Sequence, residues 1–189
     1  MLLDLACIVL AYLIGSVSAA CIVAYIFGGI DMRSEPDGRI SASEVHRKLG
    51  KLPFALTVVL DILLSASAVL LAYFLTGSND VMMMAGFASV LGHNWSLLIG
   101  FKGGLGATAI AGVLFVLLAW QMLYVLLIAA IVMLFSHRSG LSTVVGIGSS
   151  PFIIWAQDDF SALVFFPIML LSLMLLKKYQ VTREPSIAD

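Results

Sequence analysis

Long, uninterrupted apolar runs constrain this chain more than any other feature of its sequence. The first, residues 5–27, carries no charged side chain, and a helix of that length spans the roughly 30 Å of hydrocarbon in a bilayer. Because a backbone in lipid must satisfy its own hydrogen bonds, spans are helices or closed barrels, and continuous apolar runs favour helices. Of the 189 residues, 61% are hydrophobic and only 11% charged, so we expect an all-α integral membrane protein.

Seven runs are candidates for membrane-spanning helices. They are 5–27, 54–75, 81–100, 107–119, 121–135, 141–155 and 160–176. The first is too long for the apolar region of a removable signal peptide, so we expect it to be retained. His93 and Asn94 interrupt the third, which predicts a break near Gly92. Joining residues 107–135 into one helix would give six spans instead. No linker or repeat is evident, which predicts a single domain over 1–189.

The basic residues predict the orientation of these spans. All ten Lys and Arg fall in segments 28–53, 93–106, 136–140 and 177–189. With seven spans and the N-terminus outside, these segments share one side, and cytoplasmic loops collect Lys and Arg. Six spans would put Arg138 on the opposite side from the first loop. We therefore predict a seven-transmembrane-helix bundle with an outer N-terminus and a cytoplasmic C-terminus. The scattered basic residues form no patch for nucleic acid.

The first predicted loop is unusually rich in charge, because residues 31–51 hold nine of the 21 charged side chains (ten basic and eleven acidic). A solvated cytoplasmic loop would show the same composition, and so would a loop that carries chemistry. The order of residues is more informative. Gly28 and Gly29 stand at the membrane edge and are followed by Asp31-Met32-Arg33, an unusual way to leave a helix.

A second polar cluster is the turn Lys102-Gly103-Gly104-Leu105-Gly106. Glycines let backbone N–H groups converge on an anion, and the helix predicted from residue 107 directs the positive end of its dipole to the same point. Lys102 adds a full charge. This pattern favours a phosphate-binding turn, although glycines also serve close helix packing in membranes.

A single carboxyl group, that of Asp61, lies inside a predicted span. Such a group is a candidate functional residue by default, and the alternative is a packing role with Ser65 or first-loop arginines as partners. Trp95, Trp120 and Trp155 lie near predicted span ends, where aromatic residues anchor helices at the interface.

These two polar clusters resemble those of the PlsY family, membrane enzymes that acylate glycerol 3-phosphate. The first stretch shares with that family Gly15, Ser16, Gly29, Asp31, Arg33, Gly38, Ala42 and Arg47, with Ser43 in place of a Thr. The second shares Gly92, His93, Phe101, Lys102, Gly103, Gly104, Gly106 and Gly112.

The chain also departs from the family pattern at several positions. Asp37 stands where the family has an active-site Ser, Glu44 where it has Asn, and Leu105 where it has a second Lys. The C-terminal segment has Lys177-Lys178-Tyr179-Gln180 and none of the His and Asn of the family signature.

The resemblance implies transfer of a fatty acyl group from acyl phosphate to the sn-1 hydroxyl of glycerol 3-phosphate. The product would be lysophosphatidic acid, made at the cytoplasmic face of the plasma membrane without cofactor or metal. The implied catalytic residues are Ser43, His93 and Asp37. Phosphate binding is assigned to Arg33, Arg47, Lys102, Gly103, Gly104 and Gly106, and supporting roles to Asp31 and Asp61.

Two other functions stay open. The departures are compatible with a catalytically degenerate relative that binds lipid phosphate or a partner enzyme. A small transporter would instead place polar residues along a path at mid-membrane, and Asp61 is the one hint of that.

Overall fold

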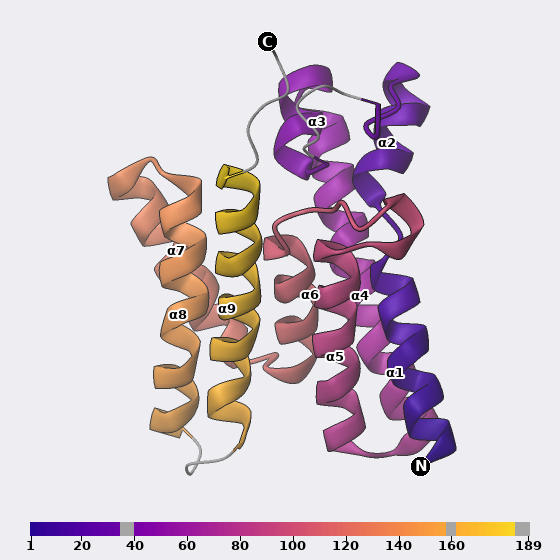
Figure 1. The fold of residues 1–189 in the computed structure, drawn as a ribbon. Helices are drawn as coiled ribbons and strands as arrows, with labels where there is room; N and C mark the ends of the chain where they lie inside the picture. Colours follow the sequence, from indigo (N-terminus) through magenta and orange to yellow (C-terminus); the bar gives the residue numbers. More distant parts are fainter. Residues whose placement is uncertain (35–39, 158–161, 184–189) are drawn as a thin grey trace. The chain divides into compact units, whose positions relative to one another are not determined.

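In the computed structural model, the described residues, 1–34, 40–157 and 162–183, form nine α-helices and one short 3-10 helix (Figure 1). They are α1 (Leu2–Gly15), α2 (Ala19–Gly28), α3 (Ala42–Leu49), α4 (Lys51–Thr76), α5 (Asn79–Asn94), η1 (Leu97–Ile99), α6 (Ala107–Leu117), α7 (Gln121–Ser136), α8 (Ser139–Gln157) and α9 (Ala162–Arg183). The expected all-α architecture is confirmed.

Among the residues that the structure describes, five apolar helical stretches are long enough to cross a membrane. They are Leu2–Gly28, Lys51–Thr76, Asn79–Ile99, Ser139–Gln157 and Leu163–Arg183. Helices α6 and α7 are apolar but shorter. Helix α6 ends at Leu117 and α7 begins at Gln121, so residues 107–135 do not form one continuous helix.

Serine side chains mark where three of the helices begin. The hydroxyl oxygens of Ser18, Ser41 and Ser78 accept hydrogen bonds from the backbone N–H three residues on, at 3.3, 3.3 and 3.4 Å. An N-cap of this kind satisfies a backbone donor that the first turn leaves without a helical partner. These caps start α2, α3 and α5.

The first apolar run is interrupted, which corrects the expectation of one helix over 5–27. Helix α1 ends at Gly15 and α2 begins at Ala19. The carbonyl oxygen of Ser16 accepts a hydrogen bond of 2.6 Å from the hydroxyl of Ser96. The interruption therefore frees a backbone acceptor that binds the segment after α5.

The break expected near Gly92 lies two residues further on, because α5 ends at Asn94 and η1 follows as a separate helix. Gly92 instead allows a close helix contact, since a Cβ built there would collide with the carbonyl oxygen of Tyr12 in α1. On the opposite side of this contact, a Cβ on Gly15 would strike the carbonyl of Ser89. Small residues at such positions let membrane helices approach closely.

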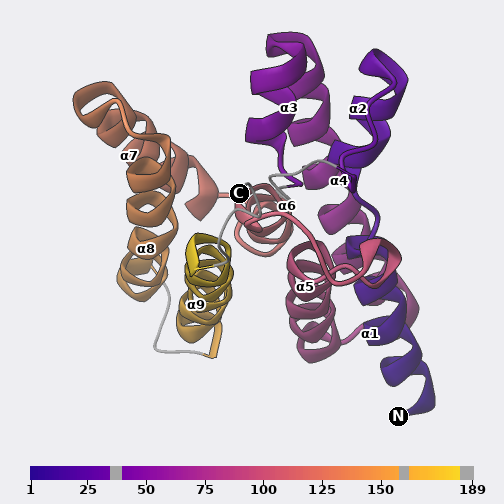
Figure 2. The same ribbon diagram turned by 45° about the horizontal axis from the view of Figure 1, so that its top comes forward.

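Contacts divide the chain into two compact units, Met1–Val113 with Met174–Asp189, and Leu114–Leu173. In the first unit, α1, α4 and α5 pack around small buried residues (Figures 1 and 2). In the second, α7 packs on α8, where the Ser142 hydroxyl donates to the Ala129 carbonyl at 2.6 Å.

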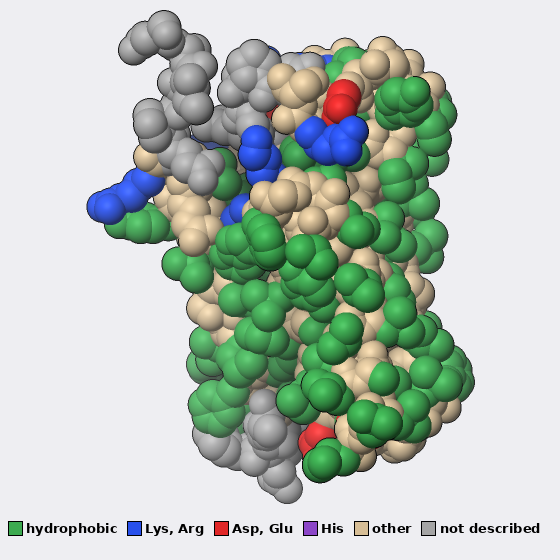
Figure 3. Space-filling model, turned by 45° about the vertical axis from the view of Figure 1, so that its right-hand side comes forward, with side chains coloured by type: hydrophobic (Ala, Val, Ile, Leu, Met, Phe, Trp, Pro, Cys, Tyr) green, Lys and Arg blue, Asp and Glu red, His purple; other side chains and the backbone are tan. Residues whose placement is uncertain are grey.

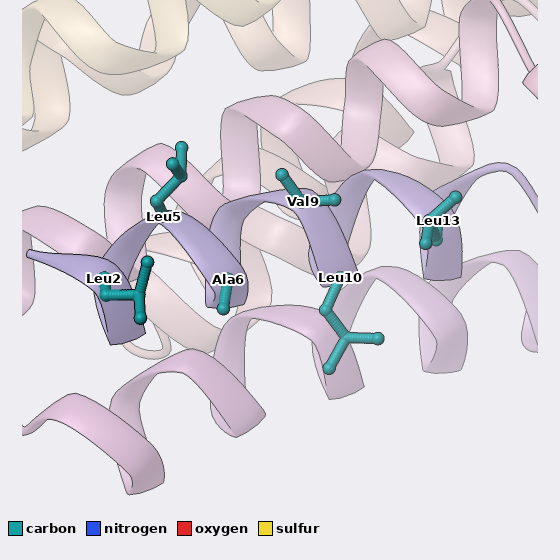
Figure 4. A pocket seen from close by; sticks show the side chains of 6 residues that line it. All are labelled: Leu2, Leu5, Ala6, Val9, Leu10 and Leu13. Carbon is teal, nitrogen blue, oxygen red and sulfur yellow. The ribbon is translucent and has the colours of Figure 1, made fainter.

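Many large hydrophobic side chains of the described residues are exposed, as lipid requires. On the face shown in Figure 3, hydrophobic side chains cover the flank, and Lys and Arg gather toward the upper end. A shallow hollow on α1 is lined only by Leu2, Leu5, Ala6, Val9, Leu10 and Leu13 (Figure 4). It has no polar side chain for chemistry, and the polar clusters of the first unit lie elsewhere.

Candidate active site

The segment after α5 folds back onto the end of that helix. The N–H of Phe101 donates to the carbonyl of Ser96 at 2.7 Å, and the N–H of Gly104 donates to the carbonyl of His93 at 3.2 Å. Figure 2 shows this segment (pink) passing over the junction of α1 and α2 before α6 begins. Its glycines are therefore held against His93 and Asn94.

Three glycines of this turn cannot be replaced without a collision. A Cβ on Gly103 would strike the carbonyl oxygens of His93 and Asn94, and one on Gly104 would strike the imidazole Nε2 of His93. Gly106 has a φ of +85°, and a Cβ there would meet the Asn94 amide. Both close approach and a left-handed backbone thus explain the glycine pattern.

The turn leads directly into α6. The carbonyl of Gly106 accepts the N–H of Ile110 at 2.8 Å, which is the first hydrogen bond of the helix. The N–H groups of the first helical turn have no partner within the helix, and they favour an anion at this end. Lys102 is exposed in the same short segment, so the segment contains a helix N-terminus and a cation.

A buried carboxyl group lies behind the turn. Asp61 of α4 is 4% exposed. Its Oδ2 accepts a hydrogen bond of 2.8 Å from the hydroxyl of Thr108 in α6, and its Oδ1 lies 3.8 Å from Nδ1 of His93. The packing alternative predicted Ser65 or the first-loop arginines as partners of Asp61. The structure corrects these partners, because Thr108 and His93 lie there instead.

Gly112 explains how Thr108 reaches Asp61. It lies one turn after Thr108 in α6, and a Cβ there would collide with the carbonyl of Ile62 in α4. The absence of a side chain lets the two helix backbones approach closely, and Thr108 then meets Asp61 across the same interface. The polar contact therefore depends on a neighbouring glycine.

Asn94 is a residue that the sequence analysis did not select for the site. It is fully buried, and within the described part of the chain neither Oδ1 nor Nδ2 has a hydrogen-bond partner. Buried amides are normally hydrogen-bonded. An asparagine at the end of a predicted span is typical of an ordinary helix terminus. Its burial beneath Gly106 could therefore be recognised only in the structure.

In the first loop, Asp31 and Arg33 form a two-point ion pair. The Arg33 Nε and one terminal nitrogen donate to Oδ1 and Oδ2 of Asp31, each at 2.9 Å. These side-chain hydrogen bonds, and then the backbone N–H of Arg33, hold the pKa of Asp31 below its usual range. The pair is exposed, so Arg33 is oriented by Asp31 while its remaining donors face solvent.

On α3, Arg47 lies one turn after Glu44. Its guanidinium contacts Oε2 of Glu44 at 2.7 and 2.8 Å. Ser43 is exposed on the same short helix. Asp37, the remaining candidate of this loop, lies outside the described residues.

Apolar packing links this loop to the segment that contains the turn. Met32, Ile40 and Val45 form a buried cluster with α2, and Ile99 of η1 packs against it. The first loop and the segment after α5 therefore meet within the first unit. Arg33, Ser43 and Arg47 belong to the first of these two segments. His93 and Lys102 belong to the second.

Comparisons with known proteins agree on one family. A model of the glycerol-3-phosphate acyltransferase family matches residues 5–184. A glycerol-3-phosphate acyltransferase of Jannaschia sp. is 38% identical over 184 residues, covering 94% of this chain and 90% of that protein. One of Lawsonia intracellularis is 31% identical over 179 residues, covering 93% and 87%.

A solved structure shows the same fold. It is the glycerol 3-phosphate form of PlsY, an integral membrane glycerol 3-phosphate acyltransferase, and it superposes with a TM-score of 0.83 at 27% identity, covering 95% of this chain and 90% of that one. The chain belongs to the PlsY family. A second structure of PlsY, in its lysophosphatidic acid form, gives the same TM-score.

The structure shows the surroundings of two residues that depart from the PlsY pattern, Glu44 and Leu105. Glu44, where the family has Asn, pairs with Arg47. Leu105, where the family has a second Lys, is 39% exposed beside Gly104. This PlsY relative therefore has one cation fewer at its turn and an added carboxylate beside an arginine.

The C-terminal helix supplies contacts that the sequence did not predict. Within the first unit, the Trp95 indole N–H donates to Oε1 of Gln180 at 3.0 Å, and Nζ of Lys177 lies 5.4 Å from the centroid of the Trp95 ring. The segment that departs most from the PlsY signature thus contacts the residue after His93 and Asn94. Trp95 has this role besides any anchoring at the interface.

The described residues contain no group of three or more His, Cys, Asp or Glu side chains placed to hold a metal ion.

Proposed function

We propose that this protein transfers a fatty acyl group from acyl phosphate to the sn-1 hydroxyl of glycerol 3-phosphate, giving lysophosphatidic acid for phospholipid synthesis. The observation that carries this proposal is the glycine turn. In this proposal the turn, the start of α6 and Lys102 bind a phosphate, and the support is that His93 lies directly behind Gly104 and that the turn leads into the first turn of α6. Family membership over residues 5–184 supports the reaction class.

The chemistry suits a site built from donors rather than from a covalent nucleophile. The glycerol hydroxyl oxygen attacks the acyl carbonyl carbon, the bond from that carbon to the phosphate oxygen breaks, and phosphate leaves with the electron pair. The hydroxyl proton passes to a base or to the departing phosphate. Acyl phosphate is already activated, so positioning of the two substrates is the main requirement, and no cofactor is needed.

We assign the two substrate phosphates to Arg33, Arg47, Lys102 and the turn formed by Gly103, Gly104 and Gly106. Within this turn the N–H of Gly104 donates to the His93 carbonyl, so Gly104 contributes by close approach of the backbone and not as a free donor. Ser43 and His93 orient the glycerol hydroxyl. Asp31 supports Arg33 through their ion pair. Asp37 keeps a catalytic assignment from its position in the family motif, outside the described residues.

We further propose that the chain acts as a single functional domain with seven spans, an outer N-terminus and a cytoplasmic C-terminus. The site then opens at the cytoplasmic face of the plasma membrane. All ten basic residues fall on that side in this arrangement, in agreement with the positive-inside tendency.

The test is acyl transfer by the purified, detergent-solubilised protein with radiolabelled glycerol 3-phosphate and palmitoyl phosphate. Palmitoyl-CoA and palmitoyl carrier protein serve as control donors. We expect product from acyl phosphate alone, loss of turnover in Lys102→Ala, and normal turnover in Lys178→Ala, a matched exposed lysine outside the assigned site.

A folded protein that gives no product with any donor would contradict catalysis. Stabilisation by glycerol 3-phosphate in such a preparation would indicate the alternative function, a degenerate relative that binds a phosphate. Product from palmitoyl-CoA at an equal rate would contradict the assignment of the donor.

A further inference from the structure

Burial of the Asp61 carboxyl group is energetically unfavourable, which suggests a role beyond helix packing. Asp61 lies in the interior of a membrane-spanning helix and is 4% exposed. A carboxyl group at such a position is stable only with partners for its oxygens. A single contact to Thr108 would join α4 to α6, but it would use only Oδ2.

The second oxygen faces a different helix. Oδ1 of Asp61 lies 3.8 Å from Nδ1 of His93, longer than the roughly 2.7–3.2 Å of an N–H···O hydrogen bond, so the two groups are neighbours, and no described residue donates a hydrogen bond to Oδ1. The other ring nitrogen, Nε2, lies against Gly104 of the turn. The imidazole therefore stands between the buried carboxyl group and the glycine turn, with one nitrogen toward each.

Gly104 makes this orientation possible. Because it has no Cβ, the ring edge reaches the turn without collision. The backbone of the same two residues is fixed by the hydrogen bond from the Gly104 N–H to the His93 carbonyl at 3.2 Å. Ring and turn are thus held together at both the backbone and the side chain.

We propose that Asp61 is a positioning residue that acts through His93. With Thr108 holding Oδ2, the carboxyl group draws the Nδ1–H of His93 toward Oδ1. The lone pair of Nε2 then faces the turn, where it accepts a hydrogen bond from the substrate hydroxyl. Which nitrogen of a histidine carries the proton is set by the hydrogen bond of the other nitrogen. The role of Nε2 toward substrate rests on the proposed acyl transfer; the orientation of the ring does not.

The first test reads the ring directly. Protein labelled with ¹⁵N-histidine in micelles at neutral pH gives imidazole signals from three histidines, and His93→Gln identifies those of His93. We expect a protonated Nδ1 in the wild type and a shift of the proton toward Nε2 in Asp61→Asn. An unprotonated Nδ1 in the wild type, or an unchanged spectrum in Asp61→Asn, would overturn the proposal.

The second test separates positioning from structure. Asp61→Asn should lower kcat about tenfold and change KM for glycerol 3-phosphate less than about threefold. This loss is smaller than the roughly 10²–10⁴-fold effect of a group that itself moves the proton, because Asp61 acts through His93. In a His93→Gln background the same substitution should cause no further loss, because the two residues act as one unit. Equal losses of kcat in both backgrounds would overturn the proposal.

Thr108 provides a matched pair of variants. Thr108→Ser keeps the hydroxyl and should retain kcat, whereas the isosteric Thr108→Val should behave as Asp61→Asn does. A Thr108→Val variant with a lower unfolding temperature but an unchanged kcat per folded molecule would show that the contact of Asp61 with Thr108 only stabilises the packing of α4 on α6. That result would overturn the proposal. If the wild type shows no turnover with any donor, the proposed function fails, and the ¹⁵N spectra still test the orientation of His93.

Discussion

At the scale of single residues, the ion pair of Asp31 and Arg33 gives the first prediction. Asp31→Asn should raise KM for glycerol 3-phosphate by roughly tenfold, about the effect of one charge-assisted hydrogen bond, because Arg33 loses its fixed orientation. The unfolding temperature should not change measurably, since exposed pairs contribute little. Steady-state kinetics beside thermal unfolding in detergent measures both, and an unchanged KM would contradict the supporting role.

The pH dependence of this pair follows from the direction of the pKa shift. The Asp31 pKa is lowered in the folded protein. Any stability from the pair is therefore fully present above the ordinary aspartate pKa of about 3.9 and is lost only as the pH falls through the lower folded value. We expect the ratio of the KM of Asp31→Asn to the KM of the wild type to stay constant between about pH 5 and 8. A change of this ratio with pH within that window would contradict the lowered pKa of Asp31.

Gly104→Ala is the second prediction at this scale. The added methyl group would strike Nε2 of His93, so we expect loss of most turnover by displacement of either the ring or the turn. Gly140→Ala is the control, because a Cβ there meets nothing within 4 Å. Specific activity per folded molecule measures the effect, and equal activities of the two variants would contradict the assigned contact.

At this scale the sequence predicted the kinds of residue better than their contacts. Lys102 and the three glycines form a turn whose chemistry follows from composition and order alone. The bond between Thr108 and Asp61 joins residues 47 positions apart, and no local pattern specifies such a contact. The burial of Asn94 could not be predicted for the same reason.

At the scale of helices, the approach of α6 to α4 depends on Gly112. Gly112→Leu should push the helices apart, destabilise the protein by about 1–3 kcal/mol as overpacking does, and separate Thr108 from Asp61. Gly148→Ala is the control, since its Cβ would lie at an ordinary 3.7 Å from Leu171. Chemical or thermal unfolding in micelles measures stability, and a Leu variant as stable as the wild type would contradict the close approach.

The helices themselves were largely predictable, and their ends less so. Apolar runs located α4, α7 and α8 to within a few residues, whereas α9 continues to Arg183, beyond the predicted end at residue 176. The split of the first run could not be read from composition, because Ser16 and Ser18 are tolerated inside membrane helices. Only the cap on α2 and the contact from Ser96 distinguish a break there.

At the scale of the whole molecule, the proposed topology can be tested by labelling of single cysteines. In a variant without Cys7 and Cys21, single cysteines at Ser34 and Ser139 should react only after a membrane-permeant reagent enters. A cysteine at Ser78 should react from outside. Six spans would move position 139 to the outer side, so its labelling by an impermeant reagent would contradict the seven-span proposal.

Family and membrane class were predictable at this scale because hydropathy and short motifs survive without knowledge of contacts. The grouping of contacts into two compact units was not, since no change of composition marks residue 113 or 174. Such a division depends on which helices contact each other, and apolar runs of similar composition do not indicate their contact partners.

The hydrogen bond from Ser96 to the Ser16 carbonyl has a consequence for biosynthesis. The two residues are 80 positions apart, and ribosomes add about 5–20 residues per second. The acceptor at the interruption of the first span therefore waits roughly 4–16 seconds for its donor to be translated. During that time, the nascent chain must keep this point near water or the insertion machinery, and the first span is completed only after the third has emerged.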